Sequence, residues 1–101
     1  MQVQPQRRID LGVKSLEQFV HDVDLELQPL NSFGHRVRLA DRVGGAEWQV
    51  DARRFILAPN VGTDWLLLDL AGGPQIALTR DERGVSEAVR FIKSWVLGAA
   101  Q

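Results

Sequence analysis

The sequence contains no cysteine and no tyrosine, and each absence removes a class of chemistry. Without thiols the chain can form no disulfide, bind no zinc through thiolates and use no cysteine nucleophile. Without tyrosine it has no phenol to act as a proton donor. Carboxylates, two histidines and the basic side chains remain for acid–base or anion chemistry.

Long apolar runs are also missing. No run approaches the roughly 20 residues that a membrane-spanning helix needs, and residues 1–8 lack the apolar core of a secretory signal. We therefore expect a cytoplasmic protein without a membrane segment. A length of 101 residues suits one domain, so we predict a mobile leader at residues 1–10 and a single α+β domain at residues 11–101.

The charge is nearly balanced, with twelve basic and thirteen acidic residues and a net charge of −1. A general nucleic-acid-binding domain is normally more basic. Arg36, Arg38 and Arg42 share one face of the first predicted strand. Three nearby carboxylates, those of Asp41, Glu47 and Asp51, interrupt the positive charge of this region. We therefore expect no nucleic-acid partner and favour a solvated sheet face with cross-strand ion pairs.

Two stretches near the ends of the chain have helical periodicity. The first begins at the capping box Ser15-x-x-Gln18 and ends near Pro29. Its apolar residues fall on one face, although its last residues also alternate as a strand would. The second helix follows a cap at Thr79 or Asp81 and ends at Gly98. Their apolar faces consist of Leu16, Phe19, Val20, Val23 and Leu27 in the first, and of Val85, Ala88, Val89, Phe91, Ile92, Trp95 and Val96 in the second.

Between these helices the apolar pattern changes to a period of two, which predicts strands. Glycine-containing turns separate them, above all Gly44-Gly45, which favours a tight hairpin. The alternation breaks at residues 53–57, and we interpret the break as a β-bulge or a bend. The prediction is a four-stranded antiparallel meander flanked by an N-terminal and a C-terminal helix (αββββα), with strands near residues 36–43, 48–57, 65–70 and 75–79.

The third predicted strand is apolar on both faces. Leu66, Leu68 and Leu70 point to one side, and Trp65 and Leu67 point to the other. If both helices cover one face, we expect Trp65 and Leu67 on the uncovered face, with Phe55 or Leu57 beside them. A homodimer packed sheet to sheet is the simplest cover for such a patch. One helix on each face would remove the need for it.

No residue pattern predicts a catalytic set. His21 and His35 are the only imidazoles and lack metal-ligand spacing, so we expect no metal and no cofactor. Asp69, between two leucines, is either an acid with a raised pKa or, as we favour, the ion-pair partner of an arginine on the adjacent strand. The candidates for a ligand site or an interface are Trp48, Trp65, Leu67, Asp69, His35, Arg38 and Arg53.

Taken together, these patterns favour a non-catalytic binding or interaction module that acts through an oligomeric sheet surface. The alternative is a small-molecule-binding protein or small enzyme with an apolar pocket between the sheet and the helices. In that case Asp69, His35 or an arginine would supply the polar group of the pocket.

Overall fold

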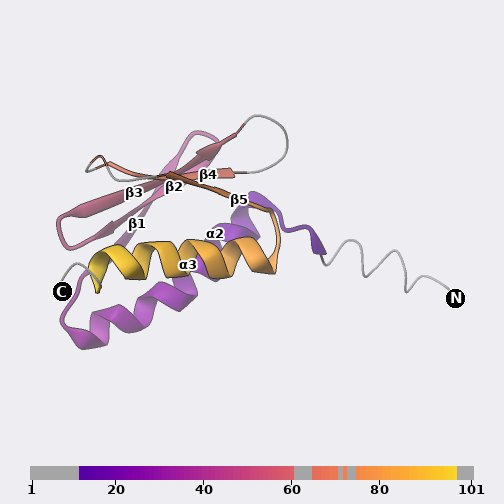
Figure 1. The fold of residues 1–101 in the computed structure, drawn as a ribbon. Coiled ribbons are helices and arrows are strands. Elements are labelled where there is room, and N and C mark those ends of the chain that lie inside the picture. The colour runs from indigo at the N-terminus through magenta and orange to yellow at the C-terminus, as the bar shows by residue number, and fades with distance from the viewer. Residues whose placement is uncertain (1–11, 61–64, 71, 73–74, 98–101) are drawn as a thin grey trace, which may run out of the picture.

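The computed structural model describes residues 12–60, 65–70, 72 and 75–97. Two helices lie on the same face of one antiparallel sheet (Figure 1). In chain order the elements are α2 (Leu16–Leu27), the 3-10 helix η1 (Gln28–Phe33), β1 (Val37–Arg42), β2 (Gly45–Val50), β3 (Arg53–Pro59), β4 (Trp65–Asp69), β5 (Gln75–Leu78) and α3 (Glu82–Val96). The α+β fold with an antiparallel sheet between two helices in the chain order is therefore confirmed, but the sheet has five strands in the order β1-β2-β3-β4-β5 and not the predicted four. The predicted leader at residues 1–10 lies outside the described residues, as does Gly98.

Helix α2 begins as predicted, at a side-chain cap. The Ser15 Oγ accepts a hydrogen bond from the Gln18 backbone N–H at 3.2 Å. The side chains of Phe19, Val23 and Leu27 are fully buried, so the helical period, and not the strand-like alternation, governs the end of this segment. The chain then continues into η1, which replaces the loop expected there, and leaves it through Gly34 at a φ of 91°.

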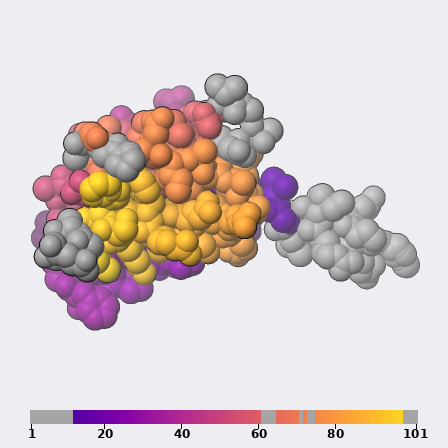
Figure 2. Space-filling view, in the orientation of Figure 1, coloured from indigo at the N-terminus to yellow at the C-terminus, as the bar shows by residue number. Residues whose placement is uncertain are grey.

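Helix α3 also begins at a side-chain cap, where the Asp81 Oδ1 accepts from the Gly84 backbone N–H at 3.1 Å. Gly84 lies in the first turn because the helix passes very close to the end of the sheet. A Cβ at this position would lie 1.8 Å from the Thr79 carbonyl oxygen and 3.0 Å from the Phe19 ring. Figure 2 shows the α3 side chains (yellow to orange) in close contact with those of the neighbouring segments.

The fifth strand arises from a turn that the sequence pattern did not reveal. Asp51 and Ala52 form a two-residue hairpin turn between β2 and β3, with Val50 opposite Arg53. The expected bulge or bend at residues 53–57 was therefore wrong. Tight hairpin turns need a positive φ, and Asp51 supplies it with a φ of 57°. Since Asp-Ala contains no glycine, the usual signal for this turn is missing.

The helix-covered face of the sheet is the opposite of the one we expected. Trp65 and Leu67 are buried beneath the helices, and the Trp65 ring meets the Phe19 ring of α2 with centroids 4.5 Å apart. The expectation that Trp65 and Leu67 lie on the uncovered face was therefore wrong, and Phe55 and Leu57, expected beside them, are buried in the core as well. Leu66 and Leu68 occupy that face, where they are half-buried. A strand that is apolar on both sides fits either orientation, and the packing of Phe19 decides between them.

Neither helix in the described part of the chain is long and apolar enough to cross a membrane.

Candidate binding surfaces

The carboxylate of Asp69 forms a partly buried ion pair with Arg53 on the adjacent strand. Its Oδ2 accepts from the Arg53 Nε at 3.1 Å and lies 3.0 Å from the Arg53 Nη2. The guanidinium also lies over the Trp95 ring of α3, 4.8 Å from the centroid. The favoured interpretation of Asp69, an ion pair with an arginine of the neighbouring strand, is confirmed. Asp69 and Arg53 thus join β3, β4 and α3.

The tryptophans and the leucine among the predicted candidates belong to the core. Trp48 and Leu67 are fully buried and Trp65 is 5% exposed. The Trp48 Nε1 donates to the Asp24 Oδ1 at 3.3 Å, which ties β2 to α2. None of the three presents its side chain as an anchor to a partner approaching from solvent, and their role as ligand contacts stays a prediction.

His35 has a partner that sequence reasoning missed. Its Nδ1 lies 2.7 Å from the Asp51 Oδ2, while the Asp51 Oδ1 accepts from the Arg36 backbone N–H at 2.9 Å. The hydrogen bond from His35, followed by the one from Arg36, holds the pKa of Asp51 below its ordinary value. These contacts hold the Asp51–Ala52 turn against the start of β1. In this structure the role of His35 is therefore to stabilise the turn.

The sheet face opposite the helices, here called the open face, has an apolar half on β3, β4 and β5. Its register places Ile56 opposite Leu68, and Leu66 between Ala58 and Ala77. Each of these side chains is at least partly exposed. The apolar half therefore forms one continuous patch of three strands. On β4, the predicted apolar surface is therefore formed by Leu66 and Leu68 and not by Trp65 and Leu67.

The other half of the open face, on β1 and β2 with part of β3, is charged. Glu47 accepts from the Arg42 Nη1 at 3.1 Å and from the Arg54 Nε on the other neighbouring strand. The hydrogen bond from Arg54 keeps the pKa of Glu47 below its ordinary value. The predicted cross-strand ion pair on a solvated sheet face is confirmed for Arg42, and Arg54 adds a second one to the same carboxylate. Arg38 lies on the same face, exposed to solvent.

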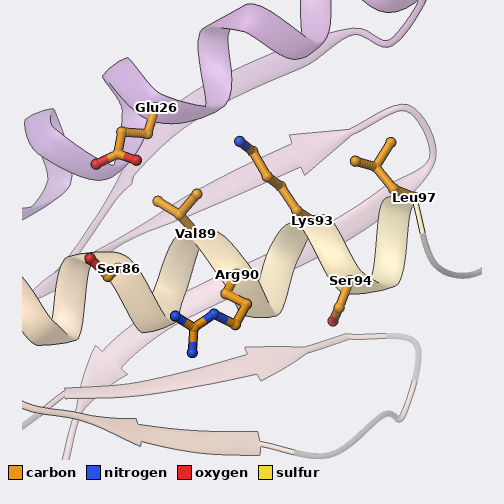
Figure 3. Close-up of a pocket in the computed structure, with 7 residues that line it drawn as sticks. All are labelled: Glu26, Ser86, Val89, Arg90, Lys93, Ser94 and Leu97. Carbon is orange, nitrogen blue, oxygen red and sulfur yellow. The ribbon is translucent and has the colours of Figure 1, made fainter.

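A shallow hollow of about 410 Å³ lies between α2 and α3 on the side away from the sheet. Figure 3 shows Glu26 on α2 facing the Lys93 and Val89 side chains of α3, while Arg90 and Ser94 point away from α2. The hollow is wide open to solvent and mixes one carboxylate with two cations. It therefore lacks the enclosed apolar wall that a small-molecule site usually has.

The described residues contain no group of three or more histidine, aspartate or glutamate side chains that could hold a metal ion. Comparison with known proteins identified no matching family model, no matching curated protein and no matching solved structure.

Proposed function

We propose that the protein is a non-catalytic binding module that acts through its open face, where a second copy of the chain covers the apolar half. The observation that supports the proposal is the continuous patch of Ile56, Leu66 and Leu68 on a face without a helix. Exposed apolar patches of this kind on soluble domains usually mark contact surfaces.

A second copy is the partner that fits this face best. A two-fold axis through the apolar half lets the patch cover itself. The charged half of each copy, with Arg42, Glu47 and Arg54, then lies at the rim and keeps its contact with water. An apolar centre with a polar rim is the usual arrangement of a protein interface.

The size of the patch indicates how tightly the two copies should bind each other. Three strands at a spacing of about 4.8 Å give an apolar half roughly 15 Å wide. This is small beside a standard interface, which buries about 800 Å² on each partner. We therefore expect a dimer that dissociates in the micromolar range and not an obligate one.

The first prediction concerns this equilibrium. Sedimentation velocity over a concentration series from low to high micromolar should show a shift from monomer to dimer. Leu68→Glu should abolish the shift because it places a charge at the centre of the patch without a partner. The matched control is Leu25→Glu, on the exposed side of α2, which should leave dimerisation unchanged. A monomer at every concentration would refute the proposal.

The alternative function, a small-molecule pocket between sheet and helices, receives no support from the packing. Phe19, Trp48, Phe55 and Ile92 fill that layer and are fully buried. A titration of tryptophan fluorescence with a metabolite panel would favour this alternative if it gave saturable quenching.

A further inference from the structure

One edge of the sheet has outward-facing backbone groups that no other described residue pairs with. Strand β1 is the edge strand and pairs with β2. The Asp51 N–H donates to the Arg36 carbonyl at 2.9 Å. Because backbone groups alternate in direction along a strand, the odd-numbered residues of β1 therefore point theirs outward. The outward N–H of Val37 donates to the Asn31 Oδ1 at 3.0 Å. Leu39 and Asp41 remain, each with an N–H and a carbonyl directed away from β2.

A groove of about 400 Å³ lies between this edge and α2. Its apolar walls are Leu16 and Val20 on α2 and Leu39 on β1. Leu39 lies on the helix side of the sheet, opposite the buried Trp48, yet 39% of its surface is exposed. A strand added to the outside of β1 would direct every second side chain to this same side. The edge and the groove are therefore suited to one extended segment.

The charge of the groove indicates what that segment carries. Glu17 and Asp24 of α2 and Asp41 of β1 line it. The other polar side chains of the groove are His21 on α2 and Arg42 at the rim. Arg42 is engaged by Glu47 on the neighbouring strand, whereas Glu17 and Asp41 form no ion pair with another described residue. Carboxylates along the wall favour lysine or arginine over acidic side chains.

We propose that β1 and α2 bind an extended segment of a partner protein by strand addition, with an apolar and a basic residue two positions apart. The apolar side chain lies opposite Leu39 and enters the groove. The basic side chain lies opposite Asp41, on the same side of the added strand. Backbone hydrogen bonds to Leu39 and Asp41 supply the affinity, and the two side chains supply the selectivity.

The probe is the capped peptide Thr-Lys-Thr-Leu-Thr-Lys-Thr, which places lysine two positions from leucine in either chain direction. Its titration into isotope-labelled protein should protect the Leu39 and Asp41 amides from hydrogen exchange. The matched peptide with glutamate in place of lysine should bind about tenfold more weakly or worse, a difference of about 1.4 kcal/mol. Equal binding of the two peptides, or no binding of either, would overturn the proposal.

Methylation of the peptide nitrogens tests strand addition separately from side-chain contacts. One set of alternating nitrogens faces β1 and the other set faces solvent. Methylation of one set should abolish binding, and methylation of the other set should change it less than about threefold, which is well under 1 kcal/mol. If both sets behave alike, the peptide does not add to the edge.

Substitutions in the protein complete the test. Leu39→Lys should weaken the lysine peptide about tenfold or more, because it brings a cation into the groove, whereas Leu25→Lys on the far side of α2 should not. If Leu39→Lys fails to fold, the methylated peptides still test whether the peptide adds to the edge of the sheet. Protection of the Leu39 and Asp41 amides without peptide, increasing with protein concentration, would assign the edge to a second copy and contradict the proposal. Because Leu68→Glu alters a different face, this monomeric variant should bind the peptide normally.

Discussion

Asp69 and Arg53 bring opposite charges together where β3, β4 and α3 meet. The Asp69 side chain is fully buried, and the Arg53 side chain is 30% exposed. Removal of one partner leaves the other with an uncompensated polar group. The pair is therefore more sensitive to a single substitution than the exposed ion pairs of the open face, for which typical contributions are small.

We expect Asp69→Asn to lower the free energy of unfolding by about 2 kcal/mol. The cost falls below that of a fully buried pair because water reaches Arg53. Urea unfolding followed by tryptophan fluorescence measures it. Glu26→Gln, at an exposed carboxylate on α2, is the control and should change stability little. If Asp69→Asn matches this control, the ion pair does not stabilise the fold.

The carboxylate of Asp51 leads to a prediction about stability at low pH. Its pKa is held below the ordinary value of 3.8 by His35 and by the Arg36 N–H. A group with a depressed pKa contributes stability above its ordinary pKa, and this contribution is lost as the pH falls through the lower, folded-state value. The melting temperature should therefore drop as the pH falls below about 4, and Asp51→Asn should make the drop smaller. Asp41→Asn, at an exposed carboxylate on β1, serves as the control. An equal drop in the Asp51→Asn variant and in the original protein would contradict the prediction.

Among the elements, α3 shows where close packing overrides helix propensity. Alanine is favoured over glycine within a helix by about 1 kcal/mol, so propensity alone predicts that Gly84→Ala stabilises the protein. The added Cβ would instead meet the backbone oxygen of Thr79. Backbone cannot move aside as a flexible side chain can.

We therefore expect Gly84→Ala to destabilise the protein by about 2 kcal/mol, in the usual range for overpacking. Thermal unfolding monitored by circular dichroism measures the effect. Ser86→Ala, at an exposed position two residues further along α3, should be neutral or slightly stabilising. A stabilised Gly84→Ala variant would show that the end of β5 can move away from the helix.

Both helices could be predicted from the sequence because their signals are local. Ser15 caps α2, Asp81 caps α3, and the apolar residues recur at helical spacing. The β2–β3 turn could not be predicted in the same way. Its positive φ is carried by Asp51, whose carboxylate is bonded to His35 and Arg36. Those partners are distant in sequence, and no residue pattern within the turn predicts them.

The candidate surfaces likewise differ in whether the sequence could predict them. The Asp69–Arg53 pair was predictable because a carboxylate within an apolar strand needs a partner and arginines stand on the neighbouring strand. The orientation of β4 was not, since both of its faces are apolar and only the position of Phe19 selects one. The groove at β1 depends on the height of α2 above the sheet edge, which residue patterns do not encode.

At the scale of the whole molecule, the helices occupy one face and leave the other to solvent or a partner (Figure 1). Lys14 fastens the helix layer at one end, where its Nζ lies 2.8 Å from the Asp22 Oδ2 and 3.5 Å from the Glu82 Oε2. The hydrogen bond with Asp22 raises the pKa of Lys14. Residues before α2 and at the start of α3 are thereby held together.

The strictly sequential strand order also bears on how the protein reaches this structure. Each described strand pairs with its neighbour in the chain, so the sheet can assemble hairpin by hairpin at a low cost in chain entropy. Contact between α2 and α3, in contrast, joins the two ends of the described chain. Local pairing of this kind favours rapid folding for a protein rich in β-structure. We therefore expect the docking of α2 against α3 to be the step with the largest loop to close.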